Sequence, residues 1–173
     1  MIFGTYRRFI LCFCLSLAVT LQARTGLAQD KPGGPKPAQI FYGLADQALA
    51  AMRQRAEALN IKGAAVVAYV PGTNVTAWIS KMVIVGNLSS HASTNDPGSN
   101  LLAIAYSKAA EMADTLKPSG SGVRRPMKGE FGWQGGWIQP CHSGWLIAAF
   151  SGGQSSEDVQ VSQTGLAVLA GSL

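Results

Sequence analysis

The sequence predicts a single mixed α/β (α+β) domain in which an antiparallel β-sheet of about five strands is flanked by helices. Predicted helices and predicted strand pairs alternate along the chain, in the order helix, hairpin, helix, hairpin, helix. Each strand pair is joined by a short turn, and short turns connect antiparallel neighbours. Of 173 residues, 47% are hydrophobic and only 13% are charged, which favours one buried core over a disordered chain.

Residues 1–28 have the features of a secretory signal peptide. A positive start at Arg7 and Arg8 precedes an apolar run, and Gly26-Leu27-Ala28, with small residues at its first and last positions, supplies a cleavage pattern. The apolar run is shorter than the roughly 20 residues that a membrane-spanning helix requires. We therefore expect cleavage after Ala28, a periplasmic or secreted location, and no stable membrane insertion of the mature chain.

The expected cleavage changes the charge and the cysteine content of the chain. The removed segment holds three of the 14 basic residues and none of the nine acidic ones, which leaves a net charge of about +2. Such a chain lacks the basic stripe of a nucleic-acid-binding protein. Cys141 becomes the only cysteine, which excludes an intramolecular disulfide. Residues 29–38, rich in proline and glycine, are expected to form a tether before a domain at 39–173.

The first half of this domain is predicted to contain one helix and one hairpin. Apolar residues recur at spacings of three and four from Gln39 to Leu59, as on the buried face of an amphipathic helix. Apolar, β-branched runs follow at 64–70 and 75–85, and the Pro-Gly-Thr-Asn segment between them has turn chemistry. A polar stretch with His91 comes next.

The second half is predicted to contain a helix, a hairpin and a closing helix. An Ala-rich helix at 101–116 begins near a cap at Ser99 or Asn100. Two strands are expected at residues 131–138 and 144–150, joined by a turn at 140–143. A closing helix is expected at 156–170.

The motifs of common enzymes are missing. The sequence contains no Gly-x-Gly-x-x-Gly, no phosphate-binding loop, no His-Glu-x-x-His and no Cys-x-x-Cys. Ser151, His142 and Asp158 are the residue types of a hydrolase triad, but Ser151 lacks the Gly-x-Ser-x-Gly turn that exposes a nucleophile. No catalytic residue is predicted, and the sequence favours a role other than catalysis.

Residues 132–153 contain three of the four tryptophans, and Trp133 and Trp137 flank Gly135-Gly136. Glycines in or beside strands allow another group to approach the backbone closely, and tryptophans supply a flat apolar wall for a planar ligand. Alternatively, the tryptophans fill the core or a subunit interface. The sequence leaves both interpretations open.

Gly135-Gly136, a turn, an apolar strand, Ser151-Gly152-Gly153 and a final Ala/Gly-bearing helix follow one another in this half of the chain. This order resembles the C-terminal half of the GlcG/HbpS-like family, which includes the haem-binding protein HbpS and PduO C-terminal-like proteins. Lys108-Ala109, with Ala113 in the same predicted helix, resembles the Lys-Ala-x-x-Ala segment of that family.

The sequence departs from the family pattern in two places. The proline of the usual Gly-Gly-x-Pro segment is displaced to Pro140, and Ala148-Ala149-Phe150 stands where the family has Gly-x-Ile-Gly. The second departure closes space where glycines normally allow close approach, so a pocket beside this strand is expected to differ.

The resemblance implies a compact antiparallel sheet flanked by helices, self-assembly into homo-oligomers, and binding of haem or a corrinoid in some members. His142 is the first candidate for a haem-iron ligand and His91 the second, because neutral imidazole ligates iron. The alternative for each is a solvated loop histidine. Lys108 either offers its charge to a haem propionate or extends along its helix to solvent. The other candidate cofactor-binding residues are Trp133, Trp137, Gly135 and Gly136.

Three functions are compatible with these observations. The leading hypothesis is an exported, homo-oligomeric binding protein for haem or a related tetrapyrrole. The alternative is a cofactor-free structural or interaction subunit of a larger periplasmic complex. A second alternative is a small enzyme that acts on haem or on an organic acid.

Overall fold

The computed structural model describes residues 36–171. The predicted signal peptide at 1–28 and most of the predicted tether at 29–38 lie outside the described residues. The described residues belong to one compact unit, which contains both hydrophobic clusters of the fold. Within this unit, no helix is both long enough and apolar enough to cross a bilayer.

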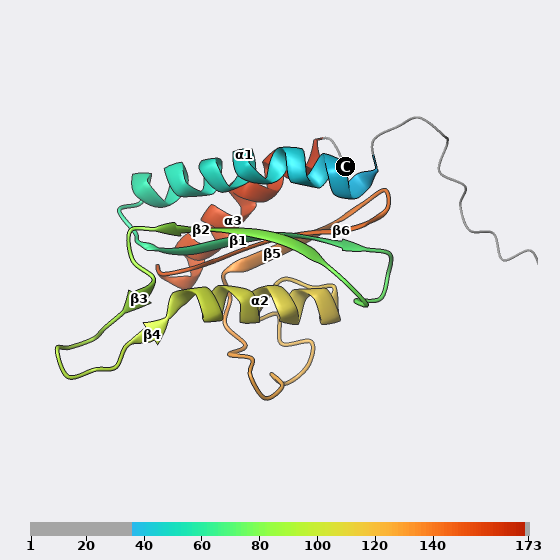
Figure 1. Ribbon diagram of the computed structural model, residues 1–173. Helices are drawn as coiled ribbons and strands as arrows, with labels where there is room; N and C mark the ends of the chain where they lie inside the picture. Colours follow the sequence, from blue (N-terminus) through green and yellow to red (C-terminus); the bar gives the residue numbers. More distant parts are fainter. Residues whose placement is uncertain (1–35, 172–173) are drawn as a thin grey trace, which may run out of the picture. The chain divides into compact units, whose positions relative to one another are not determined.

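The domain has three layers, with helices on both faces of one sheet (Figure 1). The elements in chain order are α1 (Pro37–Ala58), β1 (Gly63–Pro71), β2 (Ile79–Val85), β3 (Ser89–Ser90), β4 (Ser99–Asn100), α2 (Leu101–Thr115), β5 (Gly136–Cys141), β6 (Gly144–Ser151) and α3 (Ser155–Ala170). The main sheet has the order β2-β1-β6-β5, and every neighbouring pair is antiparallel. The predicted α+β class is confirmed, with four strands in the main sheet and two in a short arm.

Strand β1 is buried on both faces of the sheet. Its odd-numbered residues Ala65 and Val67 pack in the cluster formed with α1 and α3, whereas its even-numbered residues Ala64 and Val66 pack in the cluster formed with α2. A strand covered on both sides has no polar alternation, which explains why this segment is a continuous apolar run. Its many alanines allow helices to approach both faces.

Helix α2 begins where the sequence indicates a cap. The side-chain oxygen of Asn100 accepts a hydrogen bond from the backbone N–H of Ala103 at 2.9 Å, so Asn100 and not Ser99 caps the helix. This bond satisfies one of the N–H groups that a helix start leaves without a partner.

Two predicted strands begin later than expected. The strand predicted at 75–85 begins at Ile79, and the strand predicted at 131–138 begins at Gly136 and continues to Cys141. The segment before Gly136 contains glycines with positive φ, including Gly132 at 65°, which interrupt an extended backbone. The local content of apolar residues therefore predicted too early a start for both strands.

The long loop between α2 and β5 is fixed by one arginine. The Arg124 guanidinium donates to both carboxylate oxygens of Glu130 at 2.6 and 2.8 Å and to the carboxylate of Asp114 on α2 at 2.8 and 3.0 Å. The Arg124 hydrogen bond is the main cause that lowers the pKa of Glu130 to about 2. A bidentate pair of this kind holds both partners in one orientation.

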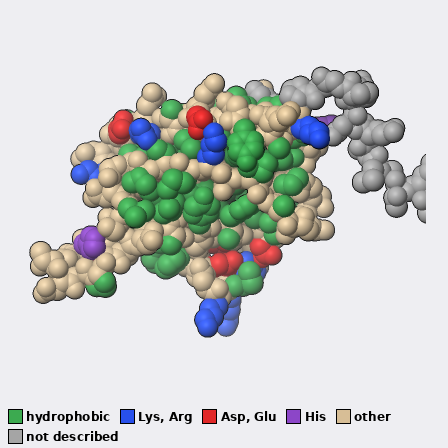
Figure 2. Space-filling view, viewed as in Figure 1, with side chains coloured by type: hydrophobic (Ala, Val, Ile, Leu, Met, Phe, Trp, Pro, Cys, Tyr) green, Lys and Arg blue, Asp and Glu red, His purple; other side chains and the backbone are tan. Residues whose placement is uncertain are grey.

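Strand β2 lies at one edge of the sheet and carries apolar side chains. Met82 is 36% exposed, and Val75 in the segment before the strand is 46% exposed. Figure 2, which has the same view as Figure 1, shows hydrophobic side chains gathered across the middle of the molecule. In Figure 1, β2 runs through this region. Lys81, bonded to Asp46 at 2.9 Å, is the charged residue within this strand.

Candidate functional site

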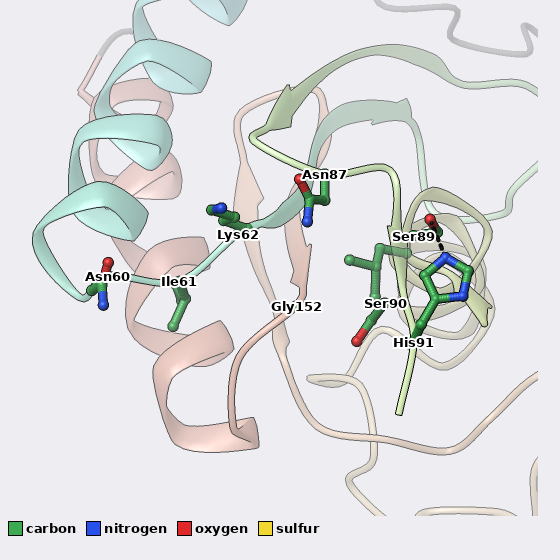
Figure 3. Close-up of a pocket in the computed structure, with 9 residues that line it drawn as sticks. Asn60, Ile61, Lys62, Asn87, Ser89, Ser90, His91 and Gly152 are labelled. Carbon is green, nitrogen blue, oxygen red and sulfur yellow. Dashed lines mark hydrogen bonds between the residues drawn. The ribbon is translucent and has the colours of Figure 1, made fainter. Parts of the chain in front are cut away.

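Two adjacent cavities lie at the end of the sheet where β1 begins and β2 and β6 end. The larger one has a volume of about 580 Å³ and is lined by Asn60, Ile61, Lys62, Asn87, Ser89, Ser90, His91, Leu101 and Gly152 (Figure 3). The smaller one, of about 210 Å³, shares Ser90, Leu101 and Gly152 with it. We refer to the two cavities together as the end groove. The arm formed by β3 and β4 supplies one wall, and the loop between α1 and β1 supplies another.

His91 is held in the larger cavity by two hydrogen bonds. Its Nδ1 lies 3.0 Å from the carbonyl oxygen of Asp96, and its Nε2 lies 2.9 Å from Oγ of Ser89. A carbonyl oxygen only accepts, so Nδ1 carries the proton and donates, and Nε2 presents a lone pair to the Ser89 hydroxyl. Metal-binding histidines commonly have this arrangement, in which one ring nitrogen donates to a carbonyl and the other is the ligand.

The arm is shaped to hold this imidazole. The carboxylate of Asp96 accepts hydrogen bonds from the backbone N–H groups of Ala92 at 2.7 Å and Gly98 at 3.0 Å, and these two bonds lower the pKa of Asp96. Gly98 has a φ of 82°, and a Cβ at this position would collide with the His91 ring. The glycine therefore provides both the turn and the space for the ring.

A buried ion pair forms part of the wall of the smaller cavity. Nζ of Lys108 donates to Oδ2 of Asp158 at 2.8 Å and to the carbonyl oxygen of Phe150 at 2.8 Å. The two charged side chains are only 3% and 4% exposed. The other carboxylate oxygen of Asp158 accepts from the backbone N–H of Gly153 at 2.9 Å. The pair thus joins α2, the end of β6 and the first turn of α3.

Burial moves both members of this pair away from their ordinary pKa values. It lowers the pKa of Lys108 and raises the pKa of Asp158, and in each case the opposite charge acts against the shift. Of the two sequence-based interpretations of Lys108, extension along the helix to solvent is wrong, because the ammonium group is buried. Contact with a propionate remains a prediction.

The glycine pair 135–136 lies against this ion pair. A Cβ on Gly135, whose φ is 137°, would collide with Nζ of Lys108 and lie 2.9 Å from Cβ of Asp158. The Gly135 carbonyl oxygen accepts from Oγ of Ser162 at 2.6 Å, and the Gly136 N–H donates to Oγ of Ser119 at 2.9 Å. The close approach expected at these glycines thus occurs with side chains of the domain itself.

The two tryptophans that flank these glycines lie in different surroundings. Trp133 is 51% exposed, lines the smaller cavity, and has its ring 4.8 Å from that of Phe131. Trp137 is 36% exposed on β5, the other edge strand, and is absent from the lining of the end groove. The structure therefore brings Trp133, Lys108 and His91 to the end groove and leaves Trp137 apart from them.

His142 lies at the opposite end of the sheet from His91. It is exposed in the two-residue turn between β5 and β6, where Gly144 pairs with Pro71. The end groove lies at the other end of β6, roughly 23 Å away at about 3.3 Å per residue. His142 therefore shares no site with Ser151 or Asp158, and the triad considered for these residues does not assemble.

Sequence reasoning missed Asp158 as the partner of Lys108 and did not identify Ser151 as a cavity residue. One signal was available for the first: Lys108 lies one helical turn from Ile104 and Met112, so it belongs to the buried face of its helix. A lysine on such a face requires a carboxylate partner. No local pattern indicated which acid it would be.

Comparison with known proteins adds no family. No family model matches the chain, and no curated protein is significantly similar to it. Among the described residues, no group of three or more histidine, cysteine, aspartate or glutamate side chains is placed to hold a metal ion.

Proposed function

We propose that this protein binds a tetrapyrrole, most simply haem, in the end groove, with Nε2 of His91 as the iron ligand. The observation that supports this proposal is the orientation of His91, whose Nδ1 donates to a carbonyl oxygen and whose unprotonated Nε2 accepts from the Ser89 hydroxyl, a bond that iron ligation would replace. A macrocycle supplies four iron ligands itself, so a single protein histidine suffices. When bound, haem would supply an iron centre for ligand binding or electron transfer.

The dimensions and residues of the end groove fit such a ligand. The larger cavity of about 580 Å³ falls within the range of roughly 300–1,000 Å³ that small-molecule sites occupy. Ile61 and Leu101 provide apolar contact in it, and Trp133 offers a half-exposed ring at the neighbouring cavity. Lys62 provides a positive charge at the other side. In contrast to the order suggested by sequence, His91 is the favoured ligand and His142 is not.

The test is a haemin titration of residues 29–173, which include both hydrophobic clusters, followed by the Soret band. We expect saturation near one equivalent, loss of the band in His91→Ala, and an unchanged titration in His142→Ala. His142 is the matched control because it is the other histidine of the chain and is also exposed. A response without saturation refutes the proposal, and loss of binding only in His142→Ala refutes the assignment of His91.

We also propose that the protein self-associates. Self-association is expected both for a homo-oligomeric tetrapyrrole-binding protein and for an interaction subunit. The apolar edge strand β2 has a row of backbone groups without a partner in the sheet, and such edges pair with other chains. We expect a dimer in light scattering that Met82→Lys converts to a monomer. Val123, 59% exposed in the loop between α2 and β5, provides the control Val123→Lys. A monomeric wild-type protein would exclude this interface.

A further inference from the structure

The smaller cavity of the end groove is lined by hydrogen-bond donors that have no protein partner. Ser151 is the most informative of them, because it is only 4% exposed and yet its hydroxyl makes no hydrogen bond within the described residues. Ser151 pairs with Ala64 in the register, so it faces α2 together with Ala149. This is the side on which the cavity lies. The hydroxyl oxygen itself is not fully enclosed but is open to the cavity, where water or a ligand can complete its hydrogen bonds.

Lys108 contributes a second donor to the same cavity. An ammonium group has three N–H bonds, and two of them are used, by Asp158 and by the Phe150 carbonyl. The third has no partner among the described residues. Each oxygen of Asp158 accepts one hydrogen bond, from Lys108 or from the Gly153 N–H, so the carboxylate is oriented towards these two donors.

The first turn of α3 contributes a third set of donors. The backbone N–H groups of Glu157 and Asp158 bond to the carbonyl oxygen of Gln154, whereas those of Ser155 and Ser156 have no partner in the described residues. Ser155 lines the cavity. The start of a 16-residue helix also carries partial positive charge, which favours an anion.

We propose that the smaller cavity binds a carboxylate group, held by the Ser151 hydroxyl, the Lys108 ammonium and the N-terminal N–H groups of α3. A carboxylate accepts several hydrogen bonds through two oxygens, and a volume of about 210 Å³ takes a short acid rather than a large ligand. The carboxylate belongs either to a propionate of a tetrapyrrole in the larger cavity or to a free organic acid. Only the first source rests on the function proposed above.

Two pairs of variants test these donors. Ser151→Ala removes the unpartnered hydroxyl, and Ser143→Ala removes a hydroxyl that bonds to Tyr69 at the opposite end of β6, as a control for the loss of a serine hydroxyl away from the cavity. Ser155→Pro removes an N–H at the first helical position, where proline is tolerated, and Ser155→Ala keeps that N–H. Gln154 has φ −69° and ψ 155°, a conformation that a following proline favours.

The experiment compares haemin, haemin dimethyl ester and acetate as probes of residues 29–173, by the Soret band and by amide chemical shifts. If a propionate occupies the cavity, the ester binds about tenfold more weakly than haemin, and Ser151→Ala and Ser155→Pro each reduce this difference whereas their controls keep it. If a free acid occupies it, acetate shifts the amide signals of residues 151–156 saturably, whether or not haemin binds.

The outcomes separate this inference from the proposed function. Equal binding of haemin and its ester, with no shifts caused by acetate, overturns the carboxylate site and leaves haem binding intact. Saturable acetate shifts without any haemin binding support the carboxylate site and refute haem binding. Absence of all three responses overturns both.

Discussion

Removal of one member of the Lys108–Asp158 pair should be among the most destabilising single changes in this domain. Lys108→Met leaves the Asp158 carboxylate buried with only the Gly153 N–H as a donor, and Asp158→Asn leaves the Lys108 ammonium buried without a countercharge. Breaking a buried pair in this way costs about 3–5 kcal/mol. A domain of this size has a free energy of unfolding of about 5–15 kcal/mol, so each variant should fold but with reduced stability.

The double variant distinguishes a true pair from two independent defects. With both charges absent, the main remaining defect is the Phe150 carbonyl oxygen, which loses its donor at a cost of about 1–3 kcal/mol. We therefore expect the double variant to be more stable than either single one, so that the two costs are strongly non-additive.

The assay is equilibrium unfolding in urea at pH 7, followed by tryptophan fluorescence and circular dichroism. The exposed pair Lys81–Asp46 is the control, because its side chains are 32% and 76% exposed and Lys81→Met should cost less than about 1 kcal/mol. Additive costs for Lys108→Met and Asp158→Asn, or a loss below about 1 kcal/mol for Lys108→Met, would refute the assignment of a buried, coupled pair.

Three further predictions concern the loop and the arm. The pKa of Glu130 is lowered from 4.5 to about 2, so its stabilising contribution is complete above pH 4.5 and is lost as the pH falls towards 2. Thermal unfolding should show Glu130→Gln less stable than wild type at pH 7, with the difference narrowing below pH 4.5 and closing near pH 2. Gly98→Ala should weaken haemin binding about tenfold through displacement of the His91 ring, and should also lower the melting temperature because alanine is strained at a φ of 82°; an unchanged affinity would argue against His91 as the ligand. Asn100→Ala removes the cap of α2 and should lower the free energy of unfolding by about 1 kcal/mol in urea titrations, whereas Asn100→Asp should retain most of it.

The order of elements was predictable because it depends on local patterns. Helix periodicity identified α1 and α2 within a few residues, and alternating turn signals separated the hairpins. The ends of β2 and β5 were less predictable, because apolar residues such as Trp78 also precede the strands and pack there without strand pairing.

The site was only partly predictable because it depends on pairings distant in sequence. His91 and His142 are chemically equivalent in the sequence, and only the antiparallel pairing of β1 with β6 places one at the end groove and the other at the far end. Likewise, Gly135-Gly136 indicated close approach correctly, but the partner, Lys108, became identifiable only once α2 was packed beside β5.

The central position of β1 also determines when this domain can fold. Its neighbour β6 is synthesised much later than β1, because Ala64 pairs with Ser151, which is about half the length of the chain away. Until β6 arrives, one edge of an almost wholly apolar strand has no partner, and such long-range pairing is slow and prone to aggregation. The first helix and hairpin therefore cannot reach their final state during synthesis. A chain of this topology completes its sheet only after nearly all of it has been released.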